Sequence, residues 1–326
     1  MRMSFARDTM ARQAAELTAR GVYLGTSSWK YEGWLGQLYT PSRYEYRGRI
    51  ASTRFERDCL TEYAEVFKTV CVDAAYYDFP RRERLEVLAS QVPEDFRFGF
   101  KVTDAITLRR FPNLARFGAR AGQPNADFLN AERFATAFLQ PLEAIRPRVG
   151  VLMFEFSRFW PGDYEHGRDF VADLDRFLGQ LPKGWPYAIE MRNRSWLREE
   201  YLGCLARHGV THVFNSWEAM PSVSDQLAIP GSRTNPELVA ARFLLKPGRK
   251  YEDAVRSFQP YNRTCEVNEE ARRAGAGIIV EGERYEPRRQ TYIYVNNRLE
   301  GNALETLCAM LEYAEQCRSG IGAVQE

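Results

Sequence analysis

The chain has few of the residues and motifs on which metal and nucleotide cofactors usually depend. Its 326 residues include only three histidines, which argues against a histidine-rich site for several zinc ions. No glycine-rich GxGxxG turn follows the first predicted strand, so a dinucleotide-binding fold is disfavoured. The six cysteines are scattered and form no CxxC pair, a pattern typical of reduced, mostly buried thiols.

Long apolar runs and a strong excess of either charge are also missing. Residues 1–20 lack the apolar core of a secretory signal, and the longest apolar run, 149–154, is far too short to span a bilayer. A net charge of +2 is too small to predict a nucleic acid or a membrane as the partner, although it leaves room for a local basic patch. We therefore expect a cytoplasmic protein with a small-molecule substrate and no membrane contact, while nucleic-acid binding and the oligomeric state stay open.

Eight short apolar segments alternate with helical patterns along the chain. Such alternation predicts parallel β/α units, and eight units favour closure into a barrel because closure leaves no strand edge exposed. The sequence thus predicts a single-domain α/β protein, a TIM-type (β/α)8 barrel at residues 21–320, with a short N-terminal helical extension at residues 1–20. A doubly wound open sheet is the alternative. The predicted strands are 22–25, 70–73, 97–101, 149–156, 187–191, 211–215, 241–245 and 291–295.

Local signals predict where several helices begin. Thr53-x-x-Glu56 and Asn302-x-x-Glu305 have the pattern of capping boxes, and Ser195 is placed to cap a helix at 197–207. A further helix is expected near 262–274. The connection at 31–52 is longer than most loops of compact domains and is rich in aromatic residues, so we expect it to form a packed lid.

Polar residues among apolar neighbours indicate which strand face points into the barrel, because side chains alternate between the two faces. In the stretch 187–196, Glu190 and Arg192 share the face opposite Ile189 and Met191. The same rule, applied to the other strands, brings a ring of further polar side chains to the C-terminal mouth of the barrel: Ser27, Asp73, Lys101, Glu155, Asn215, Arg242, Tyr294 and Asn296.

Charged groups from several strands that meet in one cleft predict a binding or catalytic site. We expect Glu190 to act as general acid or base, with Lys101 and Arg192 clamping a phosphate or carboxylate group and Asp73 completing the catalytic set. The substrate is then small and anionic or hydroxylated, and its phosphate or sugar content is open. The residues expected to contact it are Ser27, Trp29, Trp34, Tyr76, Glu155, Asn215, Arg242, Tyr294 and Asn296.

Other interpretations of the same residues stay open. The charges could form a structural ion cluster that only closes the barrel, or the barrel could bind a metabolite or a nucleic acid without catalysis, using the basic loop 246–250. The carboxylates could hold Mg²⁺ or Mn²⁺ in a phosphodiesterase or nuclease, but Lys101 and Arg192 beside them oppose a metal ion. We therefore expect no metal ligands and no cofactor. His208 and His212 are expected to be half-exposed and structural. These residues do not distinguish between a hydrolase, an isomerase and a lyase.

A series of short motifs runs through residues of about 21–316: Gly25-Thr-Ser-Ser-Trp29, Gly33-Trp34, Tyr39-x-Pro41, Tyr76-Tyr77, Phe98-Gly-Phe-Lys101, Ile106-Thr107, Glu190-Met-Arg192, Ser195-Trp196, Tyr292-x-Tyr294-Val-Asn296-Asn297 and Gly301-Asn302. In this order they resemble the DUF72 (YecE-like) family, β/α barrels of undetermined biochemical role. The resemblance implies the barrel and says little about activity.

The chain departs from the pattern of that family at five positions. Cys71 stands where glutamate is usual, Asp73 replaces asparagine and Glu155 replaces glutamine. Leu108 and Asn193 occupy positions where histidine is common. A mechanism that needs those two histidines is therefore not expected in this chain.

Overall fold

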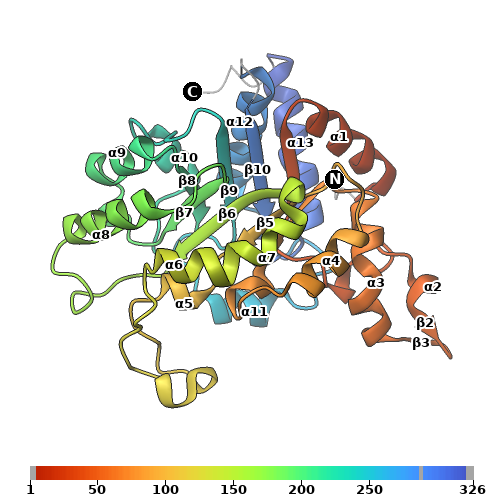
Figure 1. Cartoon of the computed structure of the whole chain (residues 1–326). Helices are drawn as coiled ribbons and strands as arrows, with labels where there is room; N and C mark the ends of the chain where they lie inside the picture. The colour runs from red at the N-terminus through yellow and green to blue at the C-terminus, as the bar shows by residue number, and fades with distance from the viewer. Residues whose placement is uncertain (1–4, 286–288, 321–326) are drawn as a thin grey trace.

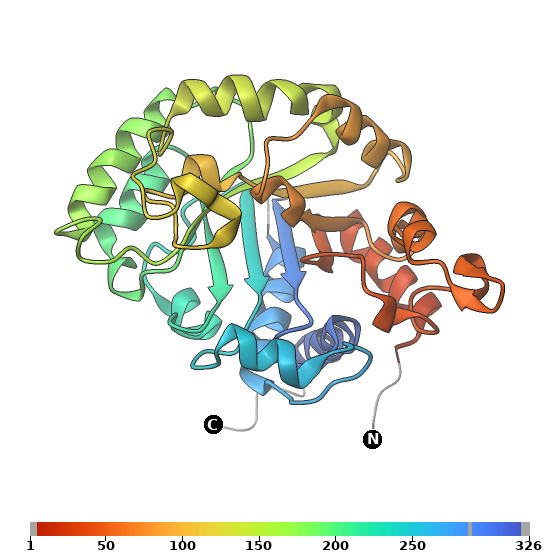
Figure 2. The same cartoon turned by 90° about the horizontal axis from the view of Figure 1, so that it is seen from below.

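The computed structural model describes residues 5–285 and 289–320, and its centre is a closed barrel of eight parallel strands ringed by helices (Figures 1 and 2). The strands follow one another round the barrel in chain order, with β1 beside both β4 and β10. The TIM-type (β/α)8 prediction is therefore confirmed. The strands are β1 (Val22–Thr26), β4 (Thr69–Val72), β5 (Arg97–Lys101), β6 (Val149–Phe156), β7 (Tyr187–Met191), β8 (Thr211–Ser216), β9 (Leu238–Phe243) and β10 (Gln290–Val295). Only β9 lies clearly earlier than the predicted 241–245.

The helices cover the outside of this barrel. Two of them, α11 and α12, replace the single helix expected near 262–274, and α6 continues through a π-helical turn (Ala135–Leu139) into α7. A small hairpin of β2 (Glu45–Tyr46) and β3 (Arg49–Ile50) extends to one side (Figure 1). The helices are α1 (Arg7–Ala19), α2 (Pro41–Tyr44), α3 (Ser52–Ala64), α4 (Arg82–Ser90), α5 (Asp104–Thr107), α6 (Ala131–Phe134), α7 (Gln140–Leu142), α8 (Gly167–Gln180), α9 (Glu199–Arg207), α10 (Val223–Ala228), α11 (Tyr251–Phe258), α12 (Glu269–Arg284) and α13 (Ala303–Arg318).

One of the three predicted helix caps forms. The Asn302 side chain accepts hydrogen bonds from the backbone N–H groups of Leu304 (2.9 Å) and Glu305 (3.1 Å) at the start of α13. The Thr53 prediction is wrong, because α3 begins two residues earlier than this cap requires and its N-cap, Ala51, makes no side-chain cap hydrogen bond. The Ser195 prediction is also wrong: Ser195 lies within a short 3-10 turn, and α9 begins only after that turn.

The N-terminal helix α1 packs against the barrel, although the sequence suggested an extension outside the main fold. Its buried side chains are Met10, Ala14 and Leu17, and the Arg7 guanidinium donates a hydrogen bond to the Leu38 carbonyl at 3.1 Å. Residues 1–4 of the predicted extension lie outside the described residues. The division of the chain at residue 20 stays a prediction. Within the described part of the chain, no helix combines the length and the apolar composition that crossing a membrane requires.

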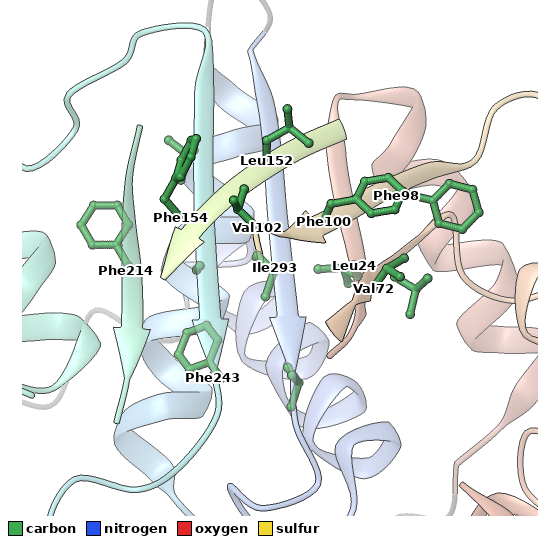
Figure 3. Close-up of a cluster of buried hydrophobic side chains, with 14 of the residues drawn as sticks. Leu24, Val72, Phe98, Phe100, Val102, Leu152, Phe154, Phe214, Phe243 and Ile293 are labelled. Carbon is green, nitrogen blue, oxygen red and sulfur yellow. The ribbon is translucent and has the colours of Figure 1, made fainter. Parts of the chain in front are cut away.

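Two apolar layers hold the barrel together. The outer layer lies between strands and helices and contains the residues labelled in Figure 3, among them Phe98, Phe154 and Ile293. The inner layer fills the barrel with small and medium apolar side chains and three tyrosines, of which Tyr23 stacks on Tyr292 with 4.8 Å between ring centroids. These buried side chains form an apolar floor for the polar residues of the C-terminal mouth.

Glycine at position 99 is required by this inner packing. A Cβ atom there would lie 2.4 Å from the Tyr294 hydroxyl oxygen, which is far inside the van der Waals contact distance. The Tyr294 hydroxyl also lies 3.0 Å from the Thr69 hydroxyl on a third strand. Tyr294 is therefore part of the barrel core, below the mouth, and its contact with a substrate stays a prediction.

His212 is buried on β8, in the layer between strand and helices. Its ring packs edge-on against Tyr201 and Phe214, with centroids 5.8 Å and 5.2 Å away. Burial lowers the pKa of His212 from 6.5 to about 4, and the hydrogen bond to Gln226 and the charge of Glu190 offset only part of that effect. The expected half-exposure therefore holds for His208 but is wrong for His212.

We predict that His212 makes the protein less stable as the pH falls from about 6.5 to about 4. In that range the unfolded chain binds a proton on this imidazole and the folded chain does not, so protonation favours unfolding. Urea unfolding at several pH values in this range should show this slope in the wild type and a shallower slope in His212→Asn. The control His166→Asn removes an exposed histidine and should keep the wild-type slope. Equal slopes in wild type and His212→Asn would contradict the prediction.

Candidate functional site

Six charged side chains from five strands meet at the C-terminal mouth of the barrel. The strand register places Glu155 of β6 beside Glu190 of β7, and Asn215 of β8 beside Arg242 of β9. Three of the six are carboxylates and three are cations, so the cluster has no net charge. We call it the mouth cluster; its members are Asp73, Lys101, Glu155, Glu190, Arg192 and Arg242. The alternation rule therefore predicted correctly that these residues come together.

One carboxylate oxygen of Glu155 forms ion pairs with all three cationic side chains of the cluster. Its Oε2 lies 2.7 Å from Lys101 Nζ, 2.7 Å from Arg192 Nη2 and 3.2 Å from Arg242 Nη1. Burial raises the pKa of Glu155, but the charges of the three cations outweigh burial and hold that pKa at about 2. Glu155 is thus a permanently ionised anchor for the cluster near neutral pH.

Glu190 lies at the centre of the cluster and is fully buried. Its Oε1 accepts a hydrogen bond from Arg192 Nε at 2.9 Å, and its Oε2 accepts one from Arg242 Nη1 at 2.5 Å. Both oxygens are therefore engaged by arginine, and solvent reaches neither. This geometry suits a residue that positions the two guanidinium groups.

Asp73 is the carboxylate of the cluster that solvent reaches. Its side chain is 35% exposed, against 3% for Glu155 and 0% for Glu190. Its Oδ1 accepts a hydrogen bond from Arg242 Nη2 at 3.2 Å, and the Cys71 thiol sulfur lies 3.5 Å from the same oxygen. Of the three acidic groups, Asp73 is the one placed to exchange a proton with a bound molecule.

Two aromatic rings cover the cations at the rim. Lys101 Nζ lies 3.5 Å from the centroid of the Tyr76 ring, and the Arg192 guanidinium carbon lies 3.7 Å from that of Trp217. Such cation–π contacts stabilise charges that are partly withdrawn from water. Tyr76 was predicted to contact the substrate. Trp217 was not, although an aromatic residue directly after the predicted sixth strand was a usable signal.

The aromatic loop at 31–52 contributes to the core instead of to an open binding surface. A 3-10 turn (Glu32–Trp34) turns Trp34 inward, where it packs on Tyr31 and Tyr39 with centroids 4.8 Å and 6.2 Å away. Trp29 is also buried, and its backbone carbonyl accepts a hydrogen bond from the Tyr39 hydroxyl. Apolar packing buries both rings, and the contact of Trp29 and Trp34 with a substrate stays a prediction.

The predicted amide and hydroxyl contacts are buried at the strand ends. The Asn215 amide donates to the Met191 carbonyl at 3.1 Å, and the Asn296 side-chain oxygen accepts from the Arg298 backbone at 3.0 Å. These two residues shape the strand-to-loop turns. Ser27 is also buried, and its hydroxyl has no partner among the described residues.

The basic loop after β9 is neutralised by an acidic neighbour. One carboxylate oxygen of Glu266 accepts a hydrogen bond from Lys246 Nζ at 2.7 Å, and the other forms an ion pair with Arg249. Glu266 thus neutralises part of the positive charge of the loop. This contact disfavours the loop as an anion site.

A pocket of about 390 Å³ opens beside the mouth cluster, next to Arg192. Its wall combines cationic side chains with aromatic rings, and Arg158, Trp160 and Arg194 are exposed there. None of these three residues was predicted from the sequence. Their positions in the loops that follow the fourth and fifth predicted strands were a usable signal. Further lining residues are Phe159, Tyr164, Glu165, Asn193, Ser195 and Trp196.

The geometry of the mouth carboxylates does not favour a metal ion there. Among residues 5–285 and 289–320, the one group of three His, Cys, Asp or Glu side chains spaced to ligate a metal lies elsewhere, between α8 and α9. At the mouth, each carboxylate is already paired with a guanidinium or an ammonium group. A divalent cation would have to displace those groups.

The fold and the site together define the class of protein. It is a (β/α)8 barrel with an electrically neutral cluster of charged side chains at its C-terminal mouth. The family model described as "Protein of unknown function DUF72" matches residues 23–325, and the chain belongs to that family. The range agrees with the motifs found in the sequence.

Solved structures support the fold assignment. The DUF72 family protein EF0366 from Enterococcus faecalis V583 is 21% identical with a TM-score of 0.60, covering 91% of this chain and 98% of its own. The DUF72 family protein TM1631 from Thermotoga maritima MSB8 is 20% identical with a TM-score of 0.56, covering 91% and 99%. At such identities the likeness shows the fold alone. The curated proteins include no match to this chain.

We predict that Glu190→Gln lowers the free energy of unfolding by about 3–5 kcal/mol, because it leaves an uncompensated positive charge between buried arginines. Adding Arg242→Met should restore part of this loss, since the remaining four charges are again balanced. Urea unfolding of the single and double variants tests both statements. Exposed Glu94→Gln is the control and should change stability by less than about 0.5 kcal/mol. A Glu190→Gln variant as stable as the wild type would show that the cluster is not held together by charge balance.

Proposed function

We propose that the chain is an enzyme that acts on a small organic anion, carrying a phosphate or carboxylate group, at the C-terminal mouth of the barrel. The observation that carries the proposal is the pocket beside Arg192, where three arginines and an exposed tryptophan, Trp160, line a space of ligand size. Arginine recognises planar or tetrahedral anions through its forked N–H donors. A tryptophan face supplies the apolar contact for the rest of the molecule.

Arg192 connects the pocket to the mouth cluster. Its Nε and Nη2 atoms bind Glu190 and Glu155, whereas its Nη1 atom has no hydrogen-bond partner among the described residues. That donor is therefore available to a ligand. Lys101 Nζ and Arg192 Nη2 are each 2.7 Å from the same Glu155 oxygen, so at most twice that distance separates them. One anionic group can contact both cations.

Proton transfer falls to Asp73 in this proposal, and Glu190 becomes a positioning residue. Glu190 has both oxygens bound by arginine, whereas Asp73 is open to solvent and paired on one side only. A carboxylate beside cations that hold an anionic substrate is suited to hydrolysis, isomerisation or elimination, in which a proton moves to or from the substrate.

A nucleic-acid-binding barrel is the second candidate, and exposed aromatic residues favour it. Trp160 and Tyr77 are 60% and 66% exposed, and each has an arginine beside its ring: Arg158 at 4.4 Å and Arg116 at 5.0 Å. Such pairs can stack on bases and contact phosphates of a single strand. The neutralised loop after β9 gives this candidate no further support.

The binding step can be tested with a panel of phosphorylated and carboxylated metabolites, with inorganic phosphate as the simplest probe. A binder found by thermal shift should bind roughly 10-fold or more weakly to Arg158→Gln and to Arg194→Gln, since a charge-assisted hydrogen bond contributes about 1.5–3 kcal/mol. Arg82→Gln, on the exposed face of α4, is the matched control and should bind as the wild type does. Unchanged affinity in both pocket variants would place the anion elsewhere. Preference for single-stranded oligonucleotides over all metabolites would favour the second candidate.

The catalytic step is tested by Asp73→Asn once a turned-over compound is known. Asp73→Asn also leaves a positive charge unbalanced at Arg242, but water reaches this position and screens that charge, so the variant should lose less stability than Glu190→Gln and should fold. We expect its affinity for the compound to be nearly unchanged and its turnover to fall by roughly 100-fold or more, the usual contribution of a general acid or base. Turnover that survives in Asp73→Asn would rule out this assignment.

A further inference from the structure

A second group of reactive side chains lies on the outside of the barrel, between α8 and α9. Cys204 and His208 are four positions apart, which places them on one face of the α9 helix and its C-cap. Asp175 comes from α8, which packs beside α9 (Figure 1). The cysteine sulfur, a ring nitrogen of the histidine and a carboxylate oxygen of the aspartate all lie within 4.8 Å of one another.

We propose that Asp175, Cys204 and His208 form a binding site for a zinc ion. Sulfur, imidazole nitrogen and carboxylate oxygen are the three ligand types of zinc in proteins. Thiolate and imidazole together select zinc over the hard ions Mg²⁺ and Ca²⁺, which prefer oxygen ligands. The proposal does not depend on the function proposed for the mouth.

The spacing of the three ligand atoms suits a tetrahedral ion with little movement. Ligands about 2.0 and 2.3 Å from a tetrahedral zinc ion are roughly 3.5 Å apart. The Cys204 sulfur lies 3.6 Å from Asp175 Oδ1, and His208 Nε2 lies 2.9 Å from the same oxygen. Binding therefore requires Asp175 and His208 to separate by a few tenths of an ångström and releases the proton of the Cys204 thiol to solvent.

The surroundings leave one coordination position open to water. Cys204 is buried, whereas the Asp175 side chain is 44% exposed and the His208 side chain 18% exposed. Arg207 Nη2 lies 3.0 Å from Asp175 Oδ1 and competes with a cation for that oxygen. The Arg207 side chain is itself 61% exposed and so can turn into solvent when the ion binds.

The zinc site lies at the end of the barrel opposite the mouth cluster. His208 comes just before β8 begins at Thr211, at the N-terminal end of that strand, whereas the mouth cluster lies at the C-terminal strand ends. In β/α barrels, residues at the N-terminal end serve stability more than chemistry. We therefore expect the ion to tie α9 to α8 and to leave binding at the mouth unchanged.

The test uses the full chain, stripped of metal with a chelator, in a Cys265→Ser/Cys317→Ser background that removes the two exposed thiols. Addition of Co²⁺, a spectroscopic substitute for Zn²⁺, should give one equivalent of a complex with a thiolate-to-metal charge-transfer band. Zn²⁺ should displace the Co²⁺ and raise the melting temperature.

Variants separate this site from chance binding elsewhere. Cys204→Ala should abolish the charge-transfer band, and His208→Gln should weaken Zn²⁺ binding at least about 100-fold, since even the loss of an outer-shell partner of a ligand costs about 10- to 100-fold. Arg207→Gln should tighten binding because it removes the competing cation. The matched controls are Cys59→Ala, a buried cysteine on α3, and His166→Gln; both should bind as the background protein does. Circular dichroism of the metal-free variants checks that they fold.

Three results would overturn the proposal. One is the absence of a charge-transfer band in the background protein. Another is Zn²⁺ affinity that is the same in folded Cys204→Ala and His208→Gln as in the background. The third is weaker Zn²⁺ binding by Arg207→Gln than by the background protein. That result would mean that Arg207 stabilises the site instead of competing with the ion.

Discussion

The sharing of two buried arginines between three carboxylates is the constraint on which the barrel mouth depends. Arg242 contacts Asp73, Glu155 and Glu190, and Arg192 contacts the last two. Charges withdrawn from water are tolerated only when they are paired and hydrogen-bonded, so each member of the cluster limits what its neighbours can do. The chemistry available at the mouth therefore belongs to the groups that the pairing leaves accessible.

The rest of the fold excludes water from the barrel interior below this cluster and leaves one side of the cluster accessible. The stacked tyrosines of the barrel interior form its floor, and Tyr76 and Trp217 cover two of its cations. The pocket next to Arg192 is where a ligand can reach the cluster without crossing the core. The proposed function at this end thus depends on the loops after β6 and β7, while the opposite end of the barrel carries the proposed zinc site.

Much of the fold could be predicted from periodicity. Seven of the eight strands lie within about one residue of their predicted positions, because buried parallel strands have short apolar runs that stand out in a sequence. Helix starts were harder. Thr53 and Ser195 have the right neighbours for a cap, but the first helix begins two residues earlier and the second follows an extra 3-10 turn. Such backbone paths depend on packing.

The sequence by itself determined that the chain forms a barrel and which charged residues face its mouth, because strand alternation is a local property that needs no knowledge of neighbours. Only the tertiary structure decided how those residues pair. It placed Glu190 under two arginines, left Asp73 open to solvent, and turned Trp34 into the core. It also brought Asp175 to Cys204 and His208 from another helix. Pairing and burial depend on distances between segments that are far apart in the chain, and no local pattern records those distances.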